Sequence, residues 1–164
     1  QTDGDFEAIV ADDGSRAATA AIVDVWKGKV GRRLDHVWHD DRGFRAAEIR
    51  NRAILASQGA YCVFLDGDCI ARPDFVAAHR HLAEPCCFVT GNRILLSSEL
   101  TARVLRDKLT PETWGFAAFI AQRLRGGNTH HGIGIAQTID QRLNGCGRPH
   151  LRQGVTRCPP DDGR

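Results

Sequence analysis

Short apolar segments alternate with amphipathic helical patterns along most of the chain, and this alternation restricts the fold more than any other feature. Residues 6–11, 34–39 and 61–65 have the length and the β-branched or aromatic content of strands. Patterns with apolar residues three and four positions apart separate them, around residues 16–26 and 46–57. Ser15 and Gly28 suit the N-cap and the stop of the first helix. We therefore predict an α/β fold with a mostly parallel sheet flanked by helices.

The patterned region continues to about residue 125. Pro73 suits the first turn of a further helix, residues 86–97 look extended, and helical patterns cover residues 98–109 and 111–124. Beyond that point glycine, arginine, proline and polar residues dominate. The sequence predicts one domain over residues 1–125 and an irregular or disordered tail over residues 126–164.

Charge and hydropathy exclude several classes of protein. The 22 basic residues nearly balance the 20 acidic ones, for a net charge of +2, and the arginines are dispersed, so no nucleic acid partner is expected. No run approaches the roughly 20 apolar residues of a membrane span, and no charged and then apolar leader opens the chain. We expect a soluble, cytoplasmic protein with no transmembrane segment.

The six cysteines fit free thiols better than disulfides. Cys62 and Cys69 flank an apolar strand, and the adjacent Cys86 and Cys87 would point to opposite faces of an extended segment. Two more cysteines lie near three histidines, without the paired close spacing of most zinc sites. A zinc site and ordinary loop residues remain the two interpretations of that group, which comprises Cys146, Cys158, His130, His131 and His150.

Two acidic turns follow predicted strands. Asp12 and Asp13 end the first strand, and Asp66 and Asp68 end the third. Ligands of open parallel sheets bind beyond the carboxyl ends of strands, so both turns are candidates for one crevice. Residues two apart in an extended segment point to the same side, and Gly67 between them allows close approach.

Carboxylate oxygens at Asp66 and Asp68 suit Mg²⁺ or Mn²⁺, which keep coordination positions open for phosphates. The alternative is an exposed turn, in which aspartate and glycine are common for local reasons. The three residues 66–68 do not decide between these interpretations by themselves.

Their neighbours in the sequence favour the metal site. The strings AIVADDGS and GFRAAEIRNRAILASQGAYCVFLDGDCIARPDFV resemble family-2 glycosyltransferases of the GT-A fold. The family shows an apolar strand ending in Asp-Asp-Gly-Ser, a helix with an Arg-Asn pair, a glycine turn and a strand ending in Asp-X-Asp, in that order. HVWHDDRGFRAAEIRN and TGNRILLS resemble its bacterial chondroitin-polymerase-like and lipopolysaccharide-biosynthesis branch. The resemblance covers about the first three quarters of the chain.

The resemblance implies roles for individual residues. Asp12 and Asp13 would lie at the nucleotide, one accepting a hydrogen bond from the uracil ring. Asp66 would lie near the ribose, and Asp68 would ligate the Mn²⁺ or Mg²⁺ that bridges the diphosphate.

The role of the helix that carries the Arg-Asn pair is less determined. Arg50 and Asn51 line the nucleotide pocket in one interpretation. In the other, Arg50 pairs with Glu48 or Asp41, and Asn51 bonds nearby backbone. Two further residues, Arg45 and His39, are interpreted as a solvated loop arginine and a surface histidine beside carboxylates.

The implied activity is metal-dependent transfer of a sugar, with inversion, from a nucleotide-diphosphate donor, for which a UDP-sugar is the expected class. The acceptor would be a saccharide or a lipid-linked saccharide in surface polysaccharide or lipopolysaccharide biosynthesis, which fits a peripheral position at the inner face of the membrane. The general base is unknown, because no aspartate among Asp140, Asp161 and Asp162 matches the family.

Two parts of the family pattern are missing from the chain. The usual first strand with its Thr-Tyr-Asn-like turn has no counterpart ahead of Gln1, and residues 126–164 do not match the acceptor half. We expect a fragment. A non-catalytic nucleotide-sugar-binding remnant is therefore the alternative function. A nucleotidyltransferase is disfavoured, because no glycine-rich loop with Lys or Arg follows the first strand.

Overall fold

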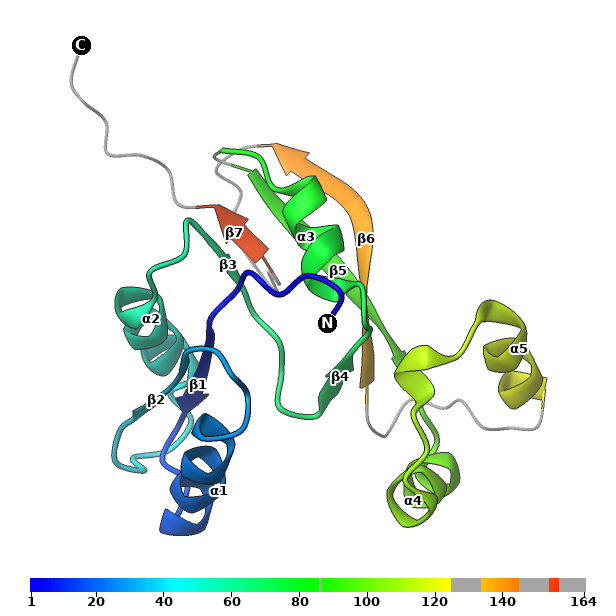
Figure 1. Cartoon of the computed structure of the whole chain (residues 1–164), viewed down its shortest axis with the longest axis horizontal. Coiled ribbons are helices and arrows are strands. Elements are labelled where there is room, and N and C mark those ends of the chain that lie inside the picture. The colour runs from blue at the N-terminus through cyan, green and yellow to red at the C-terminus, as the bar shows by residue number, and fades with distance from the viewer. Residues whose placement is uncertain (86, 125–133, 145–153, 157–164) are drawn as a thin grey trace. The chain divides into compact units, whose positions relative to one another are not determined.

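The computed structural model describes residues 1–85, 87–124, 134–144 and 154–156 (Figure 1). The chain divides into two compact units, and each is described by itself below. The N-terminal unit is Gly4–Cys62, and the C-terminal unit combines Gln1–Asp3 with Val63–Arg164. The domain limit predicted near residue 125 is a different boundary and stays a prediction.

The N-terminal unit contains two strands and two helices in alternation. They are β1 (Ala8–Asp12), α1 (Ala17–Lys27), β2 (Leu34–Trp38) and α2 (Ala46–Ala56). β1 and β2 pair in parallel, in a register that runs from Ala8 opposite Leu34 to Asp12 opposite Trp38. α2 contacts both strands, and α1 contacts β2. This small parallel sheet with its helices confirms the α/β class.

Buried side chains at helical spacing explain how the helices pack. Ile49 and Ala53, four residues apart on α2, are buried, as is Val23 on α1. Gly28 is the C-cap of α1, as predicted. Ser15 is not the N-cap: Arg16 occupies that position, and Ser15 belongs to the preceding turn, where its amide donates to Asp12.

The C-terminal unit is built around a mixed sheet. Its elements are β3 (Tyr61–Val63), which crosses the boundary between the units, β4 (Cys69–Ala71), α3 (Phe75–Leu82), β5 (Cys87–Leu95), α4 (Ser98–Asp107), the 3₁₀ turn η1 (Pro111–Thr113), α5 (Phe116–Leu124), β6 (Gly134–Asn144) and β7 (Gly154–Thr156). The strand order is β3-β7-β5-β6-β4. α3 contacts β6.

Strand direction in this sheet differs from the prediction of a mostly parallel sheet. β4 pairs with β6 in parallel, whereas β5 is antiparallel to both β6 and β7. The strands β6 and β7 lie where an irregular tail was expected. Their alternation was hard to detect because polar residues outnumber apolar ones: in the sequence of β6 the large apolar residues Ile135, Ile139 and Leu143 are four positions apart.

A hydrophobic cluster forms the core around α4 and α5. Leu96, Leu100, Val104 and Phe119 are all buried, and partly buried Trp114 packs against them, with its ring 5.8 Å from that of Phe119. The side chain of buried Ser97 accepts a hydrogen bond from Leu100 N and caps α4. This part of the unit is well packed.

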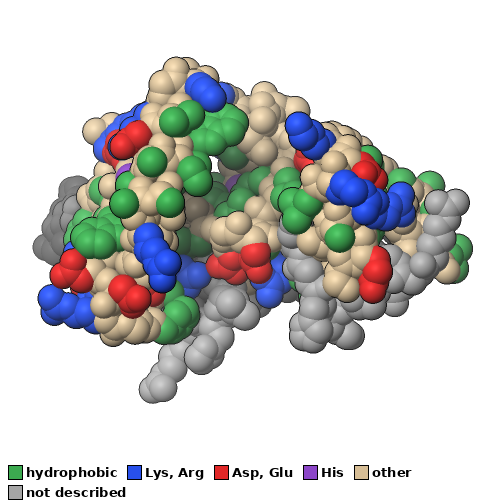
Figure 2. Space-filling view, turned by 90° about the horizontal axis from the view of Figure 1, so that it is seen from below, with side chains coloured by type: hydrophobic (Ala, Val, Ile, Leu, Met, Phe, Trp, Pro, Cys, Tyr) green, Lys and Arg blue, Asp and Glu red, His purple; other side chains and the backbone are tan. Residues whose placement is uncertain are grey.

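Surface composition agrees with the balanced charge. On the face shown in Figure 2, side chains of both signs are interspersed with hydrophobic ones. Among the described residues, no helix is both long and apolar enough to cross a membrane. Cys62, Cys69 and Cys87 are free thiols, as predicted. The cysteines and histidines of the possible zinc group lie outside the described residues.

Candidate functional site

The first acidic turn is tied to its own unit by Asp12. This carboxylate is 5% exposed. Its Oδ1 accepts from Ser15 N at 2.7 Å, and its Oδ2 lies 2.9 Å from His36 Nε2. Burial by itself would raise the pKa of Asp12, but the hydrogen bonds from Ser15 and His36 outweigh it and hold the pKa below 3.8. Asp12 therefore fixes the end of β1 against β2 as an ionised group.

Asp13 links three segments of the same unit. Its Oδ1 is 2.5 Å from His39 Nε2, beyond β2, and its Oδ2 accepts from the backbone amide of Arg45 at 2.7 Å, at the start of α2. The hydrogen bond from His39, followed by that from the Arg45 amide, lowers the pKa of Asp13. A carboxylate at a helix N-terminus is also favoured by the helix dipole.

His39 corrects a sequence-based interpretation. We expected a surface histidine, whereas it is 5% exposed and bonded to Asp13. Residues 13 and 39 each follow the end of a strand, and the parallel pairing of β1 and β2 brings them together. Arg45 is likewise not a solvated loop arginine, because its side chain bonds the carbonyl of Asp40 and the carboxylate of Glu48.

Gly14 allows the turn to pass close to the following loop. Its φ is +89°, and a Cβ at this position would lie 2.5 Å from Asp41 Cα. The indole of Trp38 donates to the carbonyl of Ser15 at 3.0 Å on the other side of the turn. The Asp-Asp-Gly-Ser turn is thus fixed by contacts along its whole length.

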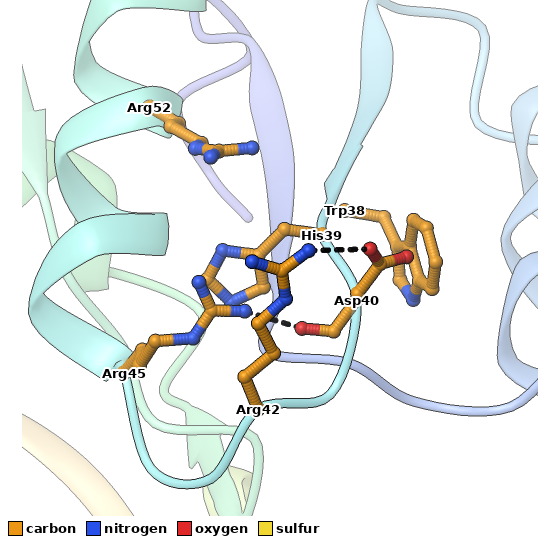
Figure 3. Close-up of a pocket in the computed structure, with 6 residues that line it drawn as sticks. All are labelled: Trp38, His39, Asp40, Arg42, Arg45 and Arg52. Atoms are coloured by element: carbon orange, nitrogen blue, oxygen red, sulfur yellow. Dashed lines mark hydrogen bonds and ion pairs between the residues drawn. The ribbon is translucent and has the colours of Figure 1, made fainter.

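A pocket of about 320 Å³ lies beside this turn, within the N-terminal unit (Figure 3). It is lined by Trp38, His39, Asp40, Arg42, Arg45 and Arg52. Trp38 is 48% exposed, and the three guanidinium groups come from the loop after β2 and from α2. An aromatic ring beside several planar donors suits a ligand that combines a ring with oxygen acceptors.

The charges of the pocket are largely balanced. Asp40 pairs with Arg42 at 3.4 Å, while Glu48 pairs with Arg45 at 3.1 Å and with Arg52 at 2.7 Å. Two buried nitrogens, His39 Nδ1 and Arg45 Nε, make no hydrogen bond within the part of the chain that the structure describes. His39 Nδ1 lies 3.7 Å from Glu48 Oε1, so the carboxylate that pairs with Arg45 and Arg52 also faces the buried imidazole.

Arg50 and Asn51 are exposed on α2 and do not line this pocket. Glu48, considered as a partner for Arg50, is engaged by Arg45 and Arg52. The nucleotide contacts expected of Arg50 and Asn51 stay predictions.

The second acidic turn has a different character. Asp66, Gly67 and Asp68 are all exposed. The carbonyl of Asp66 accepts from Cys69 N at 3.0 Å, so the segment is a tight turn and not the extended continuation of β3 that we expected. β3 ends two residues earlier than predicted, at Val63, and Leu65 is 40% exposed.

The acidic side chains of this turn lie near an arginine and a thiol. Asp66 Oδ2 lies 3.6 Å from Arg93 Nη1, and Asp68 Oδ1 accepts from the Cys69 thiol at 3.6 Å. Burial raises the pKa of that thiol. A Cβ on Gly67 would meet nothing within 4 Å, and its φ is not positive, so folding does not require glycine there.

The acidic turn fits a divalent ion only together with a substrate. Within the described residues, no three His, Cys, Asp or Glu side chains gather closely enough to hold a metal ion. Mg²⁺ in phosphate-binding sites is commonly held by one or two carboxylates plus substrate phosphates. The exposed Asp66 and Asp68 match that donor set.

The structure brings the predicted residues together in two groups. In one unit Asp13 bonds the start of α2, next to Asp12 at the end of β1, and in the other Asp66 lies near Arg93, with Asp68 in the same turn. His36 and Arg93 were missed from the sequence. For His36 the alternation of β2 was a usable signal, whereas Arg93 reaches the turn through a sheet that includes β6, which the sequence did not predict.

Comparison with known proteins identifies the family. The model of glycosyl transferase family 2 matches residues 1–147 of the 164. The chain belongs to glycosyl transferase family 2. This confirms the family that the sequence motifs indicate. The region that matches the family contains both acidic turns and the pocket.

Two curated relatives share 32% identity with this family-2 chain over 93 residues, or 51% of the chain. Both are described as validoxylamine A glucosyltransferase, from Streptomyces hygroscopicus subsp. jinggangensis (strain 5008) and subsp. limoneus. The match covers 22% and 20% of their respective lengths. No solved structure matches the chain significantly.

Proposed function

We propose that this glycosyltransferase transfers a sugar from a nucleotide-diphosphate donor, with a UDP-sugar as the preferred class, to a saccharide acceptor. The family match over the region that holds both acidic turns carries the proposal. Both curated relatives are named as glucosyltransferases, so UDP-glucose is the first donor to test. A saccharide or lipid-linked saccharide of a surface polysaccharide or lipopolysaccharide is the proposed acceptor, with the protein at the inner face of the membrane.

The exposed turn is the proposed binding site for the diphosphate. Asp68 would hold Mn²⁺ or Mg²⁺, and Asp66 would lie near the ribose. When bound, such an ion stabilises the charge that develops on the leaving diphosphate. Two carboxylates without it would repel that group.

The first acidic turn is proposed to form part of the nucleotide pocket. Asp13, whose side chain is 23% exposed, borders the arginine-lined pocket through its contact with His39. Each carboxylate oxygen has two lone pairs, so Asp13 can accept a further hydrogen bond from a base N–H while keeping its present partners. Asp12 is buried and acts by positioning this turn. Arg50 and Asn51 are proposed as nucleotide contacts from α2.

Titration of UDP with Mn²⁺ tests the donor site. We expect Asp68→Ala to weaken Mn²⁺-dependent UDP binding by about tenfold or more, because the carboxylate proposed to ligate the ion is lost. Asp107→Ala removes another partly exposed aspartate of the same unit and should bind like the unaltered protein. Equal affinity for UDP in Asp68→Ala and the unaltered protein would exclude the metal role. Donor binding without transfer or hydrolysis would select a non-catalytic binding function.

Gly67→Ala tests whether the turn must be approached closely. The added methyl group meets no protein atom, so the melting temperature should stay the same. If the diphosphate lies against the backbone of the turn, we expect UDP affinity to fall by roughly threefold to tenfold. Gly115→Ala, also in open space in the same unit, is the control. Unchanged UDP affinity in Gly67→Ala would place the diphosphate elsewhere.

A further inference from the structure

One arginine of the C-terminal unit faces the exposed acidic turn. Arg93, in β5, places Nη1 3.6 Å from Asp66 Oδ2 and 4.0 Å from the sulfur of Cys69. Its side chain is 45% exposed and that of Asp66 is 47% exposed, so the pair is open to solvent and to ligands. Arg93 lies 27 residues beyond Asp66 in the sequence.

The sheet fixes where this arginine lies. In β6, Ala136 pairs with Arg93 of β5 on one side and with Ala71 of β4 on the other. β4 begins at Cys69, directly after the acidic turn. Arg93 therefore lies in a strand of the same sheet as β4, the strand that follows the acidic turn. The sheet, rather than a loop, places Arg93 near Asp66.

We propose that Arg93 is a donor-binding residue that neutralises the acidic turn before a divalent ion binds and then contacts the donor diphosphate. The inference rests on the proposed donor site at Asp66 and Asp68. In this role Arg93 disfavours binding of the ion alone and favours binding of the ion together with the donor.

The signs of the charges lead to two opposite consequences. Before any ligand binds, Arg93 lowers the repulsion between Asp66 and Asp68. A divalent cation arriving alone is repelled by the guanidinium, so Arg93 weakens binding of the ion alone. A diphosphate attracts both the ion and the guanidinium, which is a good donor to phosphate oxygens. Arg93 therefore couples the ion and the donor positively.

Two titrations of Arg93→Gln test the inference. Mn²⁺ binding without nucleotide, followed by electron paramagnetic resonance, should become roughly fivefold tighter, because a competing cation close to the carboxylates is gone. Binding of UDP in saturating Mn²⁺ should become roughly fivefold weaker or more, because a phosphate contact is lost. A purely structural role for Arg93 would weaken both binding events and lower the melting temperature.

Two matched variants complete the design. Arg93→Lys keeps the positive charge and should bind Mn²⁺ alone about as the unaltered protein does. Arg106→Gln removes an exposed arginine from α4 of the same unit, where it pairs with Asp107, and should change neither titration.

The outcomes separate this inference from the proposed function. Opposite shifts in the two titrations of Arg93→Gln support it. If UDP binding depends on Mn²⁺ and on Asp68 but Arg93→Gln matches the unaltered protein in both titrations, the inference is wrong and the donor site stands. If the unaltered protein binds neither Mn²⁺ nor UDP, both are wrong.

Discussion

Gly14→Ala is expected to destabilise the N-terminal unit by about 3 kcal/mol. A positive φ costs an alanine about 1–2 kcal/mol, and the φ of Gly14 is +89°. The new Cβ would also lie 2.5 Å from Asp41 Cα, so the backbone of one of the two segments has to move. Such overpacking adds typically about 1–3 kcal/mol. Against a total stability of about 5–15 kcal/mol, the loss is large.

Gly43→Ala separates the two contributions. The φ of Gly43 is +85°, close to that of Gly14, but a Cβ there meets nothing within 4 Å. This variant should therefore lose only the conformational part, about 1–2 kcal/mol. Urea unfolding followed by circular dichroism measures both. Equal losses in Gly14→Ala and Gly43→Ala would show that the approach to Asp41 is not tight.

Acidification from pH 6.5 to 4 is expected to remove about 3 kcal/mol of stability through His79. This histidine of α3 is 1% exposed and contacts the ring of Phe75 edge to face at 4.7 Å. Burial lowers its pKa from 6.5 to about 4. Between these values the unfolded chain binds a proton that the folded protein does not. The stabilisation is thus complete above pH 6.5 and is lost as the pH falls toward 4.

His79→Gln should flatten this pH dependence, since the buried group no longer titrates. The free energy of unfolding is measured by urea titration at several pH values between 7 and about 4. His81→Gln, two residues further along and exposed, should keep the slope of the unaltered protein. Asp12 and Asp13 act in a lower range, because the stabilisation from their lowered pKa values is present above the unfolded value of 3.8 and is lost as the pH falls through their folded pKa values. An unchanged slope in His79→Gln would show that His79 is not buried as a neutral group.

The sequence predicted the N-terminal unit better than the rest. Its strands and helices are local in pattern, with an apolar face on each helix and β-branched residues in each strand, and the observed bounds differ from the predicted ones by a few residues. The buried ion pairs were not predictable to the same degree. His39 meets Asp13 because parallel strands align their carboxyl ends, and that contact depends on register rather than on neighbouring residues.

The C-terminal unit was predicted less well from the sequence. β6 has too few apolar residues for its alternation to stand out, and its pairing with both β4 and β5 determines the mixed direction of the sheet. Without β6, nothing in the sequence relates Arg93 to Asp66. The extended geometry expected at Asp66 and Asp68 also failed, because the chain closes a hydrogen-bonded turn there. Long-range pairing thus decided the direction of the sheet and the place of Arg93, whereas a local turn decided the geometry of residues 66–68.

The two acidic turns differ in how much order they already have before a ligand arrives. Both oxygens of Asp12 and both of Asp13 are held by neighbouring groups, so the first turn loses little conformational entropy when a nucleotide binds. The side chains of the second turn are exposed and have more rotamers to give up. At the proposed donor site, most of the conformational entropy cost of binding would therefore come from ordering the second turn.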